Sequence, residues 1–335
     1  MELKKWRRWL IASILISAAS LAIIFMLTST QRAIPLIIHT SPLFLLIILI
    51  IHTLHWFFWA LRIKIMAHAL GDKISFTWAF RIVMVNLFMA SITPSSFGGE
   101  PSRIYMLSQG NLSGGDATAL TLGERLIDFI FFGVALPIMF ILLGITINLK
   151  DLQYELLAAA LIFIFGGFFL LFIVTHASWF KKRIRKFERV VRLFVKNEER
   201  RKNVMKKIER EFDSFVKGMV VIFKRKWLYF LGALGATVVM WVADFSIPSL
   251  ILLALGHQPF WLLSITFQMI ILLITIVPIS PGGSGLAEFS AYFLYSQKLP
   301  KDLVGAVVIL WRILTFYMNL FVGLAFTLHY IKKGK

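Results

Sequence analysis

The sequence predicts an all-α polytopic membrane protein with about six full spans and two re-entrant broken-helix elements, arranged as two inverted-topology repeats. Hydrophobic residues make up 59% of the 335 residues and charged residues only 16%. Several apolar runs are long enough to cross ~30 Å of hydrocarbon as helices. A Pro-x-Ser-x-Gly-Gly pattern also occurs twice, at 94–99 and 278–283, and each copy interrupts an apolar run. Such breaks in both halves are typical of transporters built from internal repeats.

A second pair of matching segments supports the repeat. ERLIDF follows the first break and WRILTF follows the second, which places Arg125 and Arg312 in equivalent positions. The separation between the two arginines is nearly the same as that between the two glycine pairs, 98–99 and 282–283. Chance similarity is the alternative, and the nearly equal spacing favours the repeat.

The first membrane half, residues 1–175, is expected to begin with a retained helix, because no small-residue cleavage site of a signal peptide follows its apolar run. Basic residues precede that run, so we expect the N-terminus in the cytoplasm. A re-entrant element is expected at 76–110, because its polar returning arm is too short to cross. The expected spans are about 9–27, 43–61, 119–147 and 156–175, and the two re-entrant arms are about 76–93 and 100–108.

Residues 176–226 form a basic cytoplasmic loop. The loop contains 18 of the 36 Lys and Arg residues but only 6 acidic residues, and so supplies +12 of the net charge of +19. Its apolar residues recur every three or four positions, which predicts amphipathic helices. Such helices can lie on an anionic leaflet. Nucleic acid is the rival partner for a basic stretch, but the flanking membrane spans favour the lipid surface.

The second membrane half, residues 227–335, is expected to repeat the plan of the first. It contains a span at about 228–255, a re-entrant element at 261–297, a last span at about 303–330 and a lysine-rich C-terminus. If either broken element crossed fully, the basic loop or the C-terminus would lie outside, against the positive-inside rule. We therefore expect both termini in the cytoplasm, with the two elements entering from opposite sides of the cytoplasmic membrane.

The two breaks are the first candidate site. Backbone exposed at membrane depth is tolerated where protein or a water-filled cavity satisfies it, and the returning helices would offer free N–H groups to a phosphate or carboxylate. Glu100 and Glu288 lie in the first turns of these helices and could instead cap them. The candidate substrate-binding residues of the breaks are Ser96, Gly98, Gly99, Ser280, Gly282, Gly283 and Ser284.

Arginines within the membrane are the stronger candidates. A charged side chain inside a span is costly and marks function, and arginine can grip phosphate with a fork of hydrogen bonds. We expect Arg125 and Arg312, with Arg103 as a possible third, to bind a lipid headgroup. The alternative is that they only pair with acidic residues and hold the repeats together. The candidates for ion pairing or proton coupling are Glu100, Glu124, Asp128, Asp244 and Glu288.

Several classes of chemistry are not expected. The chain has no cysteine, which excludes disulfides, thiolate metal sites and a cysteine nucleophile. His52 and His55 are spaced for a metal, but no carboxylate or third histidine is near them in sequence, so we expect packing instead. Nothing resembles a phosphate-binding loop, and we expect no cofactor and no metal.

TPSSFGGEPSR, GERLIDF, PISPGGSGLAEF and the ending WRILTFYMNLFVG resemble the flippase-like membrane domain of lysylphosphatidylglycerol synthetases. The resemblance covers nearly the whole chain and implies movement of a phospholipid or polyprenyl lipid between leaflets. The sequence contains nothing like the soluble aminoacyl-transferring domain of the full synthetases, so lysine transfer to lipid is not expected.

The predicted function is that of a lipid flippase-like carrier rather than an enzyme, with an anionic membrane lipid as its partner. The headgroup is expected in a polar cavity between the repeats while the acyl or prenyl chains stay in lipid. Two alternatives remain. One is an integral-membrane enzyme using Glu100, Glu124 or Glu288 as acid or base, and the other is a membrane scaffold for a lipid-modifying enzyme.

Overall fold

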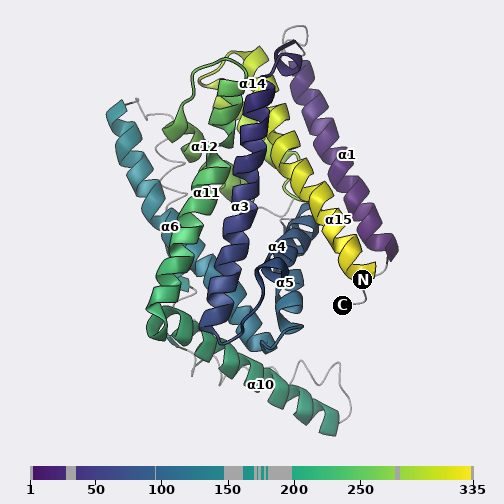
Figure 1. Ribbon diagram of the computed structural model, residues 1–335, viewed down its shortest axis with the longest axis vertical. Helices are drawn as coiled ribbons and strands as arrows, with labels where there is room; N and C mark the ends of the chain where they lie inside the picture. Colours follow the sequence, from purple (N-terminus) through teal and green to yellow (C-terminus); the bar gives the residue numbers. More distant parts are fainter. Residues whose placement is uncertain are drawn as a thin grey trace.

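The computed structural model describes residues 3–27, 35–94, 96–146, 161–169, 198–275 and 280–332, with four single positions between 172 and 179. The secondary structure of this part of the chain is helical, apart from one isolated bridge. Figure 1 shows most helices running along the long axis of a bundle. Their bounds are α1 Leu3–Leu27, α3 Pro42–Ala69, α4 Phe76–Ser91, α5 Gly99–Ser108, α6 Gly114–Thr146, α10 Glu198–Val220, α11 Trp227–Ala254, α12 Trp261–Thr275, α13 Leu286–Ser296, α14 Lys301–Arg312 and α15 Met318–Lys332.

Three helical stretches in the described part of the chain are long and apolar enough to cross a membrane. They are α3, α11 and the continuous stretch Lys301–Lys332, in which a π-helical segment, Ile313–Tyr317, joins α14 to α15. α1 and α6 correspond to two further expected spans. The span expected at 156–175 and the turn before it lie largely outside the described residues, although 161–169 are helical.

Both expected broken elements contain two short helices rather than one long helix. α4 and α5 have 16 and 10 residues, and α12 and α13 have 15 and 11. At 1.5 Å per residue none of them reaches ~30 Å. We call 92–98, between α4 and α5, the first break and 276–285, between α12 and α13, the second break. In Figure 1, α4 and α5 occupy the lower half of the bundle, whereas α12 and α14 occupy the upper half.

The two breaks touch each other. Pro94 and Pro281 form an antiparallel bridge, and the Gly282 backbone N–H donates to the Thr93 carbonyl at 3.0 Å. Segments from the two halves of the chain are therefore in direct backbone contact at the point where each broken element turns.

The two residues that meet at the bridge are not equivalent positions of the repeated pattern. The repeated pattern aligns Pro94 with Pro278, whereas the structure brings Pro94 against Pro281. The matching glycines also differ in conformation, since Gly282 is left-handed, with φ of +57°, whereas Gly98 is right-handed at the start of α5.

The buried apolar residues form two main clusters, one toward each end of the bundle. One cluster gathers parts of α3, α4, α5 and the start of α6, and the other gathers the end of α6 with parts of α11, α12, α13 and α14. α3 and α11 run side by side through both clusters. The two broken elements pack against this pair, with α4 against α3 and α12 against α11.

The basic loop contains one described amphipathic helix, α10, which Figure 1 shows lying across one end of the bundle. Phe215 and Met219 pack against Ala119 and Leu126 of α6, as the apolar spacing predicts. The Glu211 carboxylate accepts a hydrogen bond from the Gly115 N–H at 2.6 Å and fixes α10 to the start of α6. Val204 and Ile208 of its apolar pattern remain partly exposed. The other amphipathic helix expected in the loop lies outside the described residues.

The contact between the breaks gives a prediction about Gly282. A Cβ at Gly282 would lie 2.6 Å from the Ser91 carbonyl oxygen and 2.7 Å from the Phe316 ring, and its φ is positive. Gly256 is the matched control, since its φ is +77° but nothing lies within 4 Å of the added Cβ. We expect Gly282→Ala to destabilise the protein by about 1–3 kcal/mol more than Gly256→Ala, the usual cost of overpacking. Thermal unfolding in detergent measures the difference, and equal midpoints for both variants would contradict the close contact.

Candidate functional site

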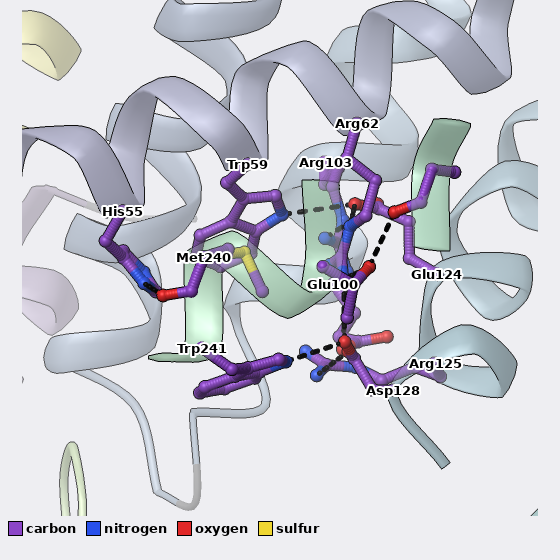
Figure 2. A network of polar contacts seen from close by, with 12 residues as sticks. His55, Trp59, Arg62, Glu100, Arg103, Glu124, Arg125, Asp128, Met240 and Trp241 are labelled. Atoms are coloured by element: carbon purple, nitrogen blue, oxygen red, sulfur yellow. Dashed lines mark hydrogen bonds and ion pairs between the residues drawn. The ribbon is translucent and has the colours of Figure 1, made fainter. Parts of the chain in front are cut away.

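Six charged side chains from three helices meet inside the bundle as an arginine–carboxylate network. α3 supplies Arg62, α5 supplies Glu100 and Arg103, and α6 supplies Glu124, Arg125 and Asp128. Figure 2 shows these residues converging, with Trp59 of α3 and Trp241 of α11 at the edge. Three arginines against three carboxylates leave the network formally neutral.

Arg62 is the most completely bonded member of the network. Its Nε donates to Glu124 Oε1 at 2.8 Å, and its Nη1 donates to Asp128 Oδ1 at 2.6 Å and to the Thr237 hydroxyl at 3.1 Å. The indole N–H groups of Trp59 and Trp241 donate to the same two carboxylate oxygens at 3.1 and 3.0 Å. Arg62 thereby ties α3 to α6 and α11.

Arg103 is fully buried yet is held mainly by charge. It lies 2.9 Å from Glu124 Oε2 and 3.4 Å from Glu100 Oε1, but none of its three side-chain nitrogens makes a well-aligned hydrogen bond within the described residues. Its guanidinium also lies 5.6 Å from the centre of the Trp59 ring, within the range of a cation–π contact. Arg103 therefore has hydrogen-bonding capacity that its present partners do not use.

Arg125 and Glu100 form the open edge of the network. The Arg125 Nε donates to Glu100 Oε1, and its Nη1 lies 3.3 Å from Asp128 Oδ2. The Arg125 side chain is 38% exposed and that of Glu100 is 28% exposed. Ser96 and Phe97, in the adjoining first break, are also exposed. This edge is where a molecule outside the bundle can reach the charges.

The second half contains a comparable pair that is closed. The Arg312 Nε donates to Glu288 Oε1 at 2.9 Å, as Arg125 does to Glu100. The Arg312 side chain is only 5% exposed and that of Glu288 is fully buried. Arg312 also contacts the Ser284 hydroxyl at 3.3 Å and lies 3.9 Å from the centre of the Phe316 ring. In each half, the arginine thus holds the glutamate from the first turn of the returning helix.

The two helix starts use their glutamates differently. Glu288 Oε2 accepts the Gly285 N–H at 2.7 Å and caps α13, and the Ser17 hydroxyl of α1 donates to its other oxygen. Glu100 makes no such cap on α5, since its partners are arginines. The expectation of a glutamate cap therefore holds for the second break but not for the first.

The small residues of the breaks serve close packing. Gly98 donates its N–H to the Thr93 hydroxyl at 2.8 Å, and Gly99 lies against Asn86. Gly283 lies against Thr275, and Ser280 is buried with no hydrogen bond to its hydroxyl among the described residues. Of the predicted break residues, Ser284 contacts a candidate arginine, whereas Ser96 stands at the exposed surface.

Asp244 lies away from both arginine sites. It approaches His52 Nδ1 at 3.3 Å and His55 Nδ1 at 3.9 Å, across the α3–α11 contact. The expectation of packing alone is wrong for these histidines, because folding brings Asp244 to them from the other half of the chain. Among the acidic candidates, Glu288 rather than Asp244 pairs with Arg312.

Sequence reasoning missed Arg62 and its tryptophan neighbour Trp59. The predicted second span ended at about residue 61, so Arg62 was assigned to the cytoplasmic side. α3 instead continues to Ala69. The apolar residues Ile63, Met66 and Ala67 follow Arg62 in the sequence, and this pattern could have placed the arginine within the helix. In the structure all three are fully buried.

The network is expensive to bury and depends on complete pairing. Removing one member of a buried ion pair typically costs about 3–5 kcal/mol, because its partner is left charged and unpaired. Any ligand that takes over one of these charges must therefore supply an equivalent charge. An anionic group beside Arg125 meets that requirement, because it can replace the Glu100 carboxylate.

Comparisons with known proteins place the chain among membrane proteins. A family model described as the lysylphosphatidylglycerol synthase TM region matches residues 10–323. A UPF0104 membrane protein of Archaeoglobus fulgidus is 35% identical, and the alignment covers 92% of this chain and 93% of that protein. UPF0104 membrane proteins of Methanocaldococcus jannaschii and Pyrococcus horikoshii are 24% and 23% identical, with alignments covering 88% and 92% of this chain and 86% and 94% of the relatives.

The network gives a prediction about stability. Arg62→Leu leaves Glu124 and Asp128 short of a buried partner, and we expect it to destabilise the protein by about 3–5 kcal/mol. Lys202→Ala is the control, because Lys202 pairs with Glu198 at 2.9 Å while both side chains are about two-thirds exposed. We expect no measurable effect from this control. Thermal unfolding compares the two variants, and a small loss with Arg62→Leu would show that the network does not hold the helices together.

Proposed function

The chain belongs to the lysylphosphatidylglycerol synthase transmembrane-region family, and from that premise we propose that it moves an anionic phospholipid or polyprenyl phospholipid between leaflets. The headgroup passes between the two halves along the arginines beside the breaks. The acyl or prenyl chains remain in the bilayer. No aminoacyl transfer and no other catalysis is part of this proposal.

The observation that carries the proposal is the unequal exposure of two similar ion pairs. Arg125–Glu100 is partly open, whereas Arg312–Glu288 is closed. Each lies beside one break, and the two breaks contact each other through Pro94 and Pro281. Carriers with inverted repeats alternate between states in which one side is open and the other is closed. We interpret the structure as one such state, with the first-half pair accessible.

The chemistry of the open pair suits a phosphate. In the present structure Glu100 occupies the Nε of Arg125, and Asp128 is close to its Nη1. A headgroup phosphate can displace Glu100 and take both sides of the guanidinium fork, which lysine cannot offer. Arg103 lies 3.4 Å from the same Glu100 oxygen that Arg125 contacts, so it can satisfy that carboxylate once Arg125 has left it. After this exchange the phosphate and Glu100 each contact an arginine, although the phosphate adds a negative charge to the neutral network.

The broken elements support entry from opposite sides. α4 and α5 lie toward one end of the bundle, and α12 and α14 lie toward the other (Figure 1). We propose that the repeats have inverted topology in the cytoplasmic membrane, with both termini in the cytoplasm, as the charges flanking the helices favour.

α10 supports a role for the anionic leaflet. It lies across the end of the bundle that holds α4 and α5 (Figure 1). Lys206, Lys207 and Arg210 lie on the same helix as the partly exposed Val204 and Ile208. Each basic residue near an anionic surface contributes about 1 kcal/mol of attraction. We propose that residues 176–226 rest on the cytoplasmic leaflet and bind no nucleic acid.

Leaflet exchange in proteoliposomes tests the proposal. Fluorescent anionic phospholipids, zwitterionic phospholipids and polyprenyl phosphates are compared for the wild-type chain and for Arg125→Ala, Arg125→Lys and Arg312→Ala. We expect exchange selective for anionic headgroups and slowed about tenfold or more in both alanine variants, since each loses a charged hydrogen bond. Arg125→Lys is expected to lose much of the rate, because it keeps the charge without the fork.

Each variant is checked for folding by size-exclusion chromatography, and Lys202→Ala is carried as the exposed control. Absence of exchange for every lipid, or exchange unaffected by both alanine substitutions, would contradict the proposal and reduce the arginines to structural ion pairs. In that case the alternative of a membrane enzyme that acts on a lipid-linked substrate is tested by substituting Glu100, Glu124 and Glu288. A scaffold becomes testable through deletion of the basic loop.

A further inference from the structure

A second polar cluster lies where α3, α11 and α15 meet, and the proposed lipid site does not use it. His52 and His55 come from α3, Asp244 from α11 and Asn319 from α15. The side chains of His52 and His55 are 1% and 7% exposed, and that of Asp244 is 24% exposed. Because two imidazoles and one carboxylate are largely buried together, the positions of their protons decide whether the cluster is charged.

The hydrogen bonds fix the direction in which His52 donates. The indole N–H of Trp56 can only donate, and it donates to Asn319 Oδ1 at 2.8 Å. That atom is therefore an acceptor, the amide oxygen. His52 Nε2 lies 3.1 Å from the same oxygen, so it must carry a hydrogen. In a neutral imidazole the other nitrogen, Nδ1, then has no hydrogen.

His52 Nδ1 faces a second acceptor. It lies 3.3 Å from Asp244 Oδ1, is buried, and makes no well-aligned hydrogen bond within the described residues. A lone pair opposite a carboxylate is repulsive unless one proton sits between them. That proton gives either an imidazolium with a carboxylate or an imidazole with a carboxylic acid.

His55 is already satisfied as a neutral side chain. Its Nδ1 lies 3.3 Å from the Met240 carbonyl oxygen, which can only accept, so Nδ1–H donates to it (Figure 2). Asp244 Oδ1 is farther away, at 3.9 Å. His55 therefore leaves the carboxylate to His52. We propose that His52 and Asp244 form a binding site for a single exchangeable proton, with Trp56 and Asn319 orienting the imidazole.

The charged surroundings favour one proton at this site. From α3, His55 is the neighbouring titratable group, and Arg62 lies farther along the helix, where it is already neutralised by Glu124 and Asp128 of α6. From α11, Asp244 is the carboxylate that faces the pair, and α15 contributes the uncharged Asn319. Without the added proton, the cluster holds an uncompensated negative charge. The partial exposure of Asp244 provides access for the proton.

Contacts connect the proton site to the arginine–carboxylate network. The His55 ring lies 5.8 Å from the Trp59 ring and 6.0 Å from the Trp241 ring, centre to centre. Those indoles donate to Glu124 and Asp128, the partners of Arg62. These contacts give proton binding at the α3–α11 contact a route to the carboxylates beside Arg125. We infer that a proton gradient drives the lipid movement, an inference that rests on the proposed function, whereas proton binding itself does not.

The proton site is tested without transport, by nitrogen-15 NMR of the full-length protein labelled at its seven histidines. His52→Gln assigns the His52 signal, and a pH titration then follows it in wild type and in Asp244→Asn. We expect proton affinity at His52 to fall about tenfold or more in Asp244→Asn, because an opposing charge is lost. His257→Gln is the control on an exposed histidine. An unchanged His52 titration in Asp244→Asn would overturn the site.

The coupling is tested as the ratio of lipid exchange with and without an imposed pH gradient. We expect the pH gradient to raise the exchange rate several-fold in wild type and His257→Gln. We expect it to leave the rate unchanged in Asp244→Asn and His52→Gln. A wild-type ratio of one would overturn the coupling. Absence of all exchange would overturn the proposed function, while the NMR titration would still decide whether the proton site exists.

Discussion

Pairing of buried charge is the constraint on which this structure depends. Burying an unpaired arginine costs several kcal/mol, so each buried arginine of the bundle needs a carboxylate. Arg62 obtains two from α6, Arg103 is held between α5 and α6, and Arg312 is held by the first turn of α13. These pairs fix how the broken helices dock against the long ones. They also make the bundle responsive, because one partner can be exchanged for another anion without leaving a bare charge.

The contact between the two breaks gives this constraint a mechanical consequence. Pro94 and Pro281 meet at a single short bridge, and Gly282 allows the approach because it has no side chain. An arginine–glutamate pair lies beside each break, and the pairs differ in exposure. A movement at the bridge that opens one pair can close the other. In the proposed carrier, that exchange moves the headgroup while each carboxylate keeps an arginine contact.

Much of the helical plan was predictable, because apolar runs, prolines and glycine pairs are local signals. The arms of both breaks followed from them, whereas the choice of Glu288 as the partner of Arg312 did not. Two features could not be predicted in this way. Asp244 reaches His52 from the other half of the chain, which no spacing rule reveals. The bridge between Pro94 and Pro281 joins residues that lie far apart in the sequence, so local signals do not reveal it. Arg62 was missed for a simpler reason, since the helix was ended too early.

Lipid binding measured by native mass spectrometry tests the central claim most directly, that an anionic headgroup takes the place of Glu100 at Arg125. Wild type, Glu100→Gln, Arg125→Gln and the double variant are compared for bound anionic and zwitterionic phospholipid. We predict that Glu100→Gln raises anionic-lipid occupancy and that Arg125→Gln lowers it. The double variant is predicted to match Arg125→Gln alone, because the gain requires the freed arginine. An equal gain from Glu100→Gln with and without Arg125 would contradict the account.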